Sequence, residues 1–302
     1  MSRDIEPPLR ERDEPRDRLP DDPRDARTRD PHDVLVRAVA LPRGPAREPV
    51  HLYSRTYDLR DAQTRMLVTI GAFRVVPANA LHDAHGRPAQ TREGDLGHLR
   101  TQGLVRTIAP KAGDQHGSLV TLTDRGHRLL EAHRVPDARQ AFFAGPGSTR
   151  ELTHDATLYR AYLRTVHDLT RHGARIERVL LEAELKRDYQ RWLQQGNVGR
   201  ADADGRPTQD REAVQTWARE HDLPYIDERV RFPDFRIEYM RPDGRRDRED
   251  VEVTTAHYRG AHAAVKAAAG FHAVRAQSMR MGGEGKGRSR PFDPRVAEEW
   301  LR

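Results

Sequence analysis

Two short runs of alternating apolar and polar residues flank a turn signal in the second half of the chain. FRIEYM covers 235–240, DVEVTT covers 250–255, and Pro242-Asp243-Gly244 stands between them. A period of two predicts strands, and Pro-Asp-Gly predicts a tight turn, so the two runs are expected to form an antiparallel hairpin. An isolated hairpin is marginally stable, so the elements around it must cover its apolar face.

The hairpin is expected to bring two carboxylates together. Side chains alternate along a strand, so Asp234 and Glu252 should lie on one face of the sheet, opposite the face of Phe235. Two neighbouring carboxylates repel each other unless positive charge lies between them. A hard divalent cation such as Mg²⁺ accepts oxygen ligands in this arrangement. The alternative is that the carboxylates pair with arginines across the strands, for which Arg236 and Arg245 are available.

The segments around the hairpin predict a domain with both helices and strands. Helical spacing over 175–196 predicts a helix in which Glu182 falls inside the apolar stripe and Glu184 on a mostly polar side. For Glu182 a salt bridge or an exposed helix edge is the alternative to a functional role. The remaining predictions are a helix over 156–173, a helix over 210–223, a strand over 225–232, an Ala-rich helix over 256–270 and a short strand over 271–276.

The preceding part of the chain has a different pattern. Apolar residues at helical spacing predict a helix from about Leu59, a short helix that opens near Pro77, and a third helix that ends near Gly103. Two β-type runs around the tip 111–117 predict a hairpin, and a last helix starts with Thr123 or Asp124 as its cap.

This order, together with the string LGHLRTQGLV…LVTLTDRGHRLLEAH, resembles the winged helix-turn-helix over about 57–134. The resemblance implies a third helix that enters the major groove of DNA and a wing that follows the backbone. A protein–protein module with an idle groove face is the alternative. The side chains expected on or near the DNA-facing surface are Arg87, Gln90, Arg92, His98, Arg100, Lys111 and His116.

The carboxylate hairpin resembles a second family. Pro233-Asp234 followed by Glu252-Val253 resembles the PD-(D/E)XK nuclease superfamily. The resemblance implies that Asp234, Glu252 and the Val253 carbonyl hold Mg²⁺ or Mn²⁺. It also implies that Glu182 corresponds to the acidic residue that many members carry on the first helix.

The chain departs from this family pattern at the lysine. Thr254 stands where the family carries it, and Lys266 on the following predicted helix is the candidate for a displaced catalytic lysine. Thr254 offers only a hydrogen bond, so an inactive or slow enzyme stays open. A solvent-facing Lys266 without a catalytic role stays open as well.

The whole layout resembles the replication-relaxation proteins of plasmids and integrative elements over about 57–275. It implies an α+β protein in which a winged helix-turn-helix (51–134) precedes a restriction-endonuclease-like domain (154–276) after a linker (135–153). The implied function is DNA binding with metal-dependent nicking or cleavage. A non-catalytic DNA binder with a degenerate nuclease fold, and a transcriptional regulator whose C-terminal part only dimerises, are the alternatives. The chain ends are expected to be a disordered Arg/Asp/Pro-rich tail over 1–50 and a flexible tail with a terminal helix over 277–302.

Composition limits the other function classes. The formal net charge is +6, which permits a polyanionic partner such as DNA. The absence of cysteine excludes disulfides and thiolate zinc sites. No apolar run approaches the roughly 20 residues of a membrane span, and no signal peptide is evident, so a cytoplasmic protein is expected. The sequence has no GxxxxGK[ST] loop and no His-x-His motif, so neither a nucleotide cofactor nor a histidine-type relaxase is expected. Both a monomer and a homodimer fit these observations.

Overall fold

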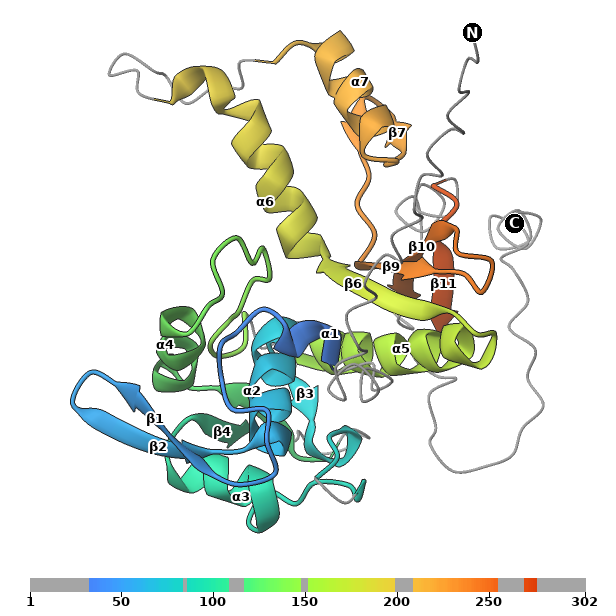
Figure 1. Ribbon diagram of the computed structural model, residues 1–302. Coiled ribbons are helices and arrows are strands. Elements are labelled where there is room, and N and C mark those ends of the chain that lie inside the picture. The colour runs from blue at the N-terminus through green and yellow to red at the C-terminus, as the bar shows by residue number, and fades with distance from the viewer. Residues whose placement is uncertain are drawn as a thin grey trace, which may run out of the picture.

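The computed structural model describes residues 33–83, 86–108, 117–147, 152–198, 209–254 and 269–275. The protein is a mixed α+β chain in which one helix, α5, lies between an N-terminal group of elements and a four-stranded sheet (Figure 1). Within the described residues, no helix is both long enough and apolar enough to cross a membrane.

The N-terminal group combines helices with two small sheets. In chain order its elements are α1 (Asp33–Val36), β1 (Glu48–Leu52), β2 (Arg55–Leu59), α2 (Asp61–Phe73), β3 (Val76–Pro77), a 3₁₀ turn (Ala78–Ala80), α3 (Gly94–Thr101), β4 (Val105–Ile108), β5 (Leu119–Leu122) and α4 (Asp124–Ala132). β1 and β2 form a hairpin, and the other sheet has the order β3-β5-β4. The short helix expected near Pro77 is only this 3₁₀ turn, because Val76 and Pro77 pair with β5 instead. Thr123 caps α4 by accepting a hydrogen bond from the Gly126 N–H, as predicted.

The prediction of a disordered tail over 1–50 was wrong for residues 33–50. Residues 33–50 include α1 and the start of β1, and Leu35, Val39 and Leu41 are buried in the main core. Val39 also forms a β-bridge with Arg134. The run DVLVRAVAL is apolar enough to pack, although the charged residues around it make the average hydrophobicity of 1–50 low. Residues 1–32 and the predicted tail 277–302 lie outside the described residues.

The C-terminal group is built on a mixed sheet with strand order β11-β10-β9-β6. β10 pairs in parallel with β11 and antiparallel with β9, and β9 is antiparallel to β6. The elements are α5 (Leu152–Arg171), β6 (Arg175–Leu181), α6 (Glu182–Leu193), a 3₁₀ turn (Gln195–Asn197), α7 (Arg211–Glu220), β7 (Tyr225–Ile226), β8 (Arg229–Val230), β9 (Phe235–Met240), β10 (Arg246–Thr254) and β11 (His272–Arg275).

The structure confirms the hairpin and corrects the helix predicted over 175–196. β9 and β10 pair as expected, and the turn closes through a hydrogen bond from the Arg241 N–H to the Arg245 carbonyl. The first seven residues of the predicted helix, RIERVLL, form β6 along β9, and only the rest is helical. β-branched Ile176 and Val179 favour a strand once a partner is present. The Ala-rich helix predicted over 256–270 lies outside the described residues, apart from its last two positions.

A chain of aromatic contacts through α5 joins the two groups of elements. Phe73 of α2 contacts Tyr159 and Tyr162 of α5, with ring centroids 5.1 and 4.9 Å apart. Tyr162 meets Phe235 of β9 edge to face at 6.2 Å. All four rings are buried. The two predicted domains therefore share one continuous hydrophobic core.

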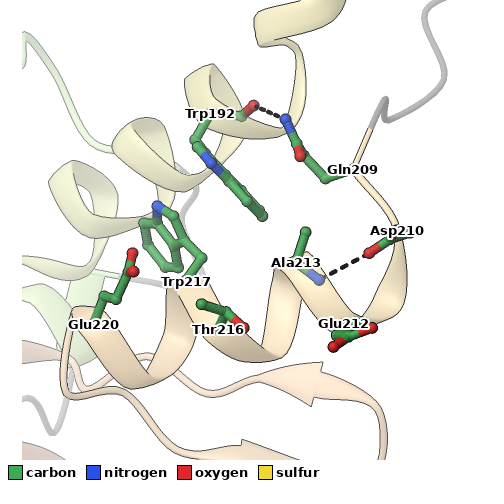
Figure 2. A pocket seen from close by; sticks show the side chains of 8 residues that line it. All are labelled: Trp192, Gln209, Asp210, Glu212, Ala213, Thr216, Trp217 and Glu220. Carbon is green, nitrogen blue, oxygen red and sulfur yellow. Dashed lines mark hydrogen bonds between the residues drawn. The ribbon is translucent and has the colours of Figure 1, made fainter.

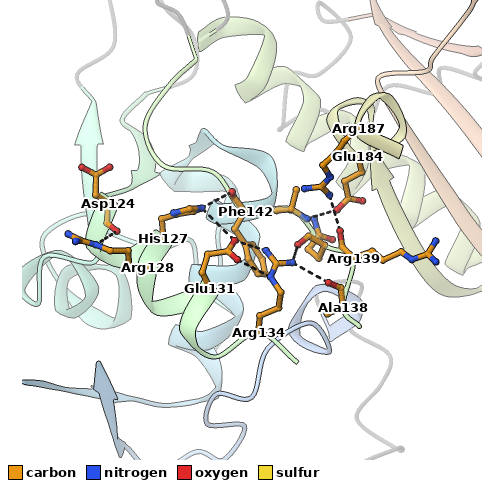
Figure 3. A network of polar contacts seen from close by, with 12 residues as sticks. Asp124, His127, Arg128, Glu131, Arg134, Ala138, Arg139, Phe142, Glu184 and Arg187 are labelled. Atoms are coloured by element: carbon orange, nitrogen blue, oxygen red, sulfur yellow. Dashed lines mark hydrogen bonds and ion pairs between the residues drawn. The ribbon is translucent and has the colours of Figure 1, made fainter. Parts of the chain in front are cut away.

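The segment predicted as a linker, 135–153, is packed over its described part (Figure 3). Phe142 is buried, and its carbonyl lies 3.0 Å from Nε2 of His127 on α4. The Arg134 guanidinium lies over the Phe142 ring and donates to the Ala138 carbonyl. These contacts fix the segment along α4, so it is not a free tether. The remaining positions 148–151 lie outside the described residues.

The same segment is tied to the start of α6 by a buried carboxylate. Glu184 is 2% exposed, and its Oε1 accepts a hydrogen bond from the Ala141 N–H (Figure 3). The Arg187 guanidinium donates to the carbonyl of Arg139 nearby. Burial raises the pKa of the Glu184 carboxyl to about 7. The prediction that Glu184 lies on a mostly polar side was wrong, because the segment with Arg139 and Ala141 packs over this side of α6.

The residues between β6 and β9 form an insertion with a core of its own. α6 and α7 project away from the sheet (Figure 1), and Tyr189, Trp192, Trp217 and Phe232 pack together between them. Figure 2 shows a pocket of about 400 Å³ beside the two tryptophans. Three carboxylates and no basic side chain line this pocket, so its charge disfavours phosphate groups.

Replacement of Glu184 by Gln should change how stability depends on pH. The folded carboxyl has a raised pKa, so the folded state binds the proton more tightly, and wild-type stability should fall as pH rises from about 4.5 to about 7. Gln keeps the acceptor for Ala141 without a charge to bury. Urea unfolding should show the variant gaining about 1–3 kcal/mol relative to wild type between pH 5 and pH 8.

The matched control is Glu212→Gln on exposed α7, which should leave the pH dependence unchanged. A Glu184→Gln variant whose stability follows pH as the wild type does would refute the assignment of this dependence to Glu184.

Candidate functional site

Three acidic residues form a row across β6, β9 and β10, at or next to the ends of β6 and β9. The sheet pairs Leu181 of β6 with Phe235 of β9, and Phe235 with Val251 of β10. β9 is antiparallel to both neighbours. Moving one residue along the sheet therefore goes back from Phe235 on β9 and forward from Leu181 and Val251 on the other two strands. That row is Glu182, Asp234 and Glu252. The Glu182 N–H donates to the Asp234 carbonyl at 2.9 Å, which continues the ladder to this row.

Asp234 and Glu252 are the buried members of the row. They are 6% and 3% exposed, and the register of β9 with β10, continued by one residue, sets Asp234 opposite Glu252. The Val253 N–H donates to Oδ2 of Asp234 at 2.7 Å, which orients the carboxylate.

The two arginines considered as alternative partners are engaged elsewhere. The guanidinium of Arg236 pairs with both carboxylate oxygens of Asp250, at 2.6 and 2.9 Å. It also donates to the carbonyls of His221 and Asp222 behind α7. Arg245 lies beside Asp243 at the exposed turn. Arg236 therefore fixes the insertion to the sheet two residues along the chain from Asp234.

Glu182 lies in the row but differs from its predicted setting. It is the first residue of α6, not a position inside the apolar stripe of a longer helix. Its Oε1 lies 2.8 Å from Nζ of Lys186, one turn along α6, and both side chains are partly exposed. The salt bridge expected as the alternative for Glu182 is therefore present. Lys186 is one of only four lysines in the sequence.

His154 lies beside the acidic row, although no pattern in the sequence predicts it there. This residue lies in the first turn of α5, and its Nε2 is 3.7 Å from Oδ1 of Asp234. α5 is the helix that directly precedes the first strand of the sheet, the place that the prediction had given to 175–196.

The remaining predicted catalytic and metal residues are only partly described. Thr254 ends β10 with its hydroxyl 3.5 Å from the Val274 carbonyl, and Val253 pairs with Val274 of β11. Lys266 lies outside the described residues. Within the described ranges, no three histidine or acidic side chains are arranged to hold a metal ion. Glu182, Asp234 and Glu252 thus share a row without their carboxylates meeting at one point.

The candidate DNA-facing residues lie around α3 and the loop before it. Arg87, Gln90, Arg92 and Arg100 are exposed. His98 is half-buried, with Nε2 3.3 Å from the Asp58 carbonyl of β2. Lys111 and His116 lie outside the described residues.

α3 is held firmly in place. The Arg60 guanidinium, at the end of β2, binds both carboxylate oxygens of buried Asp95 at 2.8 and 2.9 Å. Gly97 faces the backbone of Arg92 so closely that a Cβ atom would lie 2.6 Å from the Arg92 carbonyl carbon. The loop that carries Arg92 therefore packs directly on α3, and only glycine fits at position 97.

Comparisons with protein-family models, curated proteins and solved structures gave no match for this chain.

Arg236→Met should destabilise the fold. The substitution leaves Asp250 and two backbone carbonyls without their guanidinium, and breaking a buried ion pair costs about 3 kcal/mol or more. Urea unfolding should measure this loss. The double variant Arg236→Met/Asp250→Leu should recover part of it, because no isolated carboxylate stays buried. Equal stability of Arg236→Met and wild type would contradict the role given to this pair.

Proposed function

We propose that this chain is a DNA-binding protein with a metal-dependent nuclease-like domain that nicks or cleaves DNA, of the kind that the replication-relaxation resemblance implies for plasmids and integrative elements. The observation that carries the proposal is the acidic row across β6, β9 and β10. Glu182, Asp234 and Glu252 come from segments up to 70 residues apart, and pairing of the strands aligns them at one end of the sheet.

The topology of the sheet supports the nuclease-like part. The order of elements agrees with the PD-(D/E)XK resemblance. It consists of helix α5, the antiparallel strands β6, β9 and β10, and the final strand β11, which is parallel to β10. The insertion with α6 and α7 lies between the first and second strands and leaves this order intact. The helix that fits the first helix of the resemblance is α5. His154 therefore joins Glu182 as a candidate to complete the site from outside the hairpin.

The N-terminal elements support the DNA-binding part. Two helices, α2 and α3, flank a 3₁₀ turn, and the β4–β5 pair and α4 follow, in the order expected for a winged helix-turn-helix. Exposed Arg92 and Arg100 stand at the two ends of α3. The net charge of +6 favours an anionic partner.

The donor chemistry of the row fits Mg²⁺ or Mn²⁺. Asp234 and Glu252 supply oxygen ligands side by side, and the Val253 carbonyl is the third donor that the resemblance implies. When bound, such a cation lowers the pKa of its water and neutralises charge on the scissile phosphate. The Val253 N–H orients the Asp234 carboxylate, and the His154 imidazole, 3.7 Å from that carboxylate, is the candidate to accept or donate a proton.

Two lysines are candidates for the role that Thr254 cannot fill. Lys266 follows β10 as predicted from the resemblance. Lys186 lies beside Glu182 at the end of the acidic row. Arginine supplies 49 of the 53 basic residues, so a lysine at either position is unusual for this chain. An ammonium differs from a guanidinium in that its pKa shifts readily and it can transfer a proton.

Asp234→Asn and Glu252→Gln should each abolish Mg²⁺-dependent cleavage while DNA affinity stays within about twofold of wild type. The assay is conversion of supercoiled plasmid, together with cleavage of single-stranded and branched DNA, in Mg²⁺ and in Mn²⁺. Glu238→Gln is the matched control, because Glu238 lies on the same face of β9 two rows from the acidic row. Lys186→Met and Lys266→Met, each compared with its Arg variant, identify the lysine that the reaction needs.

The rival proposal is a non-catalytic DNA binder that retains the fold. Thr254 at the lysine position favours this rival, and so does the separation of the Glu182 side chain toward Lys186. Wild-type protein that binds DNA but cleaves none of these substrates would establish the rival.

Arg92→Ala and Arg100→Ala should each weaken DNA binding by about fivefold or more. Both side chains are exposed at the ends of α3, where they can reach phosphates or base edges. Fluorescence anisotropy over a series of salt concentrations measures the affinity, and loss of a phosphate contact should lower the salt slope by about one. Arg219→Ala, on exposed α7 of the insertion, is the control. Full affinity in both α3 variants would contradict the placing of the DNA at this helix.

A further inference from the structure

The hairpin of β1 and β2 carries an exposed and strained tyrosine at its tip. Tyr53 is 86% exposed and is the first of the two residues between the strands. Its φ is +54°, in the left-handed region that a side chain with a Cβ disfavours. Two-residue hairpin turns place Gly, Asn or Asp at such positions. Folding alone therefore does not account for a large aromatic ring here.

The hairpin under this ring is firmly built. β1 and β2 pair over five successive positions, from Glu48 with Leu59 to Leu52 with Arg55. Val50, Leu52, Tyr57 and Leu59 are buried on its inner face. The tip is therefore presented by an ordered ribbon, and an aromatic side chain on such a support loses little conformational freedom when it binds.

The hairpin is also linked to α3. The side-chain amide of Gln102, at the C-terminal end of α3, accepts from the Asp58 N–H at 2.9 Å and donates to the Asp58 carbonyl at 3.1 Å. On the other strand, Nε2 of His133, at the end of α4, lies 3.1 Å from the His51 carbonyl. These hydrogen bonds hold the hairpin against the ends of α3 and α4.

The charge near the tip suits a nucleic acid. From Pro49 to Tyr57 the hairpin contains no acidic residue, and Arg55 is exposed directly beyond the turn. A planar ring next to a guanidinium is the combination with which proteins hold unpaired bases and their backbone.

We propose that Tyr53 is a stacking platform for an unpaired base, next to the duplex that α3 binds, and that the β1–β2 hairpin acts as a second DNA-contacting wing. This inference rests on the proposed DNA-binding function and names its substrate class: DNA in which a duplex adjoins unpaired bases. Stacking requires a base with a free face, which a fully paired duplex does not offer. Arg55 contacts the phosphate beside the stacked base.

The test uses the full-length chain and two fluorescent probes, one duplex with a short single-stranded tail and the same duplex fully paired. Wild type and Tyr53→Phe should bind the tailed probe about fivefold or more tightly than Tyr53→Gly does. All three should bind the paired duplex alike. A 2-aminopurine base in the tail should change its fluorescence with wild type and Tyr53→Phe only.

Stability makes this test specific, because glycine relieves the strained turn. Tyr53→Gly should raise the midpoint of thermal unfolding by about 2 °C while binding falls, so lost binding cannot be ascribed to misfolding. Ser54→Gly alters the same turn and should leave binding unchanged. Equal affinity of Tyr53→Gly and wild type for the tailed probe overturns the inference alone. No DNA binding by wild type overturns the proposed function and this inference together.

Discussion

The contact of Tyr162 with Phe73 on one side and Phe235 on the other is the constraint on which the rest of the structure depends. It places α5 between the N-terminal elements and the sheet, so one hydrophobic core serves both. Aromatic rings of this size dominate the energetics of a core, and their loss is felt across every element that they touch. A division into independently moving domains joined by a tether does not agree with this packing. The segment along α4, with Phe142 buried, extends the same core.

Strand pairing in the sheet is what aligns the acidic row. Asp234 and Glu252 are buried because the hairpin fixes their face, and Glu182 joins them only because β6 pairs with β9. The Arg236–Asp250 pair neutralises the neighbouring row and holds α7 against the sheet. The sheet therefore carries the Arg236–Asp250 ion pair two residues along the strands from the row of Asp234 and Glu252.

The sequence was informative where structure is local. Alternation and Pro-Asp-Gly predicted the β9–β10 hairpin, and helical spacing with Thr123 as cap predicted α2 and α4. The prediction of a helix for RIERVLL was wrong because this segment becomes a strand only by pairing with β9. β9 follows a long insertion, and the local spacing of residues does not indicate such a distant partner. For the same reason the contact of His154 with Asp234, which joins α5 to the sheet, has no signal in the spacing of residues. Leu35 and Val39 were missed because many charged residues surround the seven apolar residues of 34–41. The charges lower the average hydrophobicity of the region but do not prevent the apolar residues from packing.

The parallel pairing of β10 with β11 has a consequence for how the chain is made. β10 is flanked by β9 on one side and by β11 on the other, and β11 is the last described element of the chain. During synthesis β10 is therefore an open edge with unsatisfied backbone groups until residue 275 has left the ribosome. β6 likewise waits for the whole insertion to emerge before β9 can join it. The acidic row therefore assembles late during synthesis. Products truncated before β11 would expose the edge of β10, which can pair with other chains and aggregate.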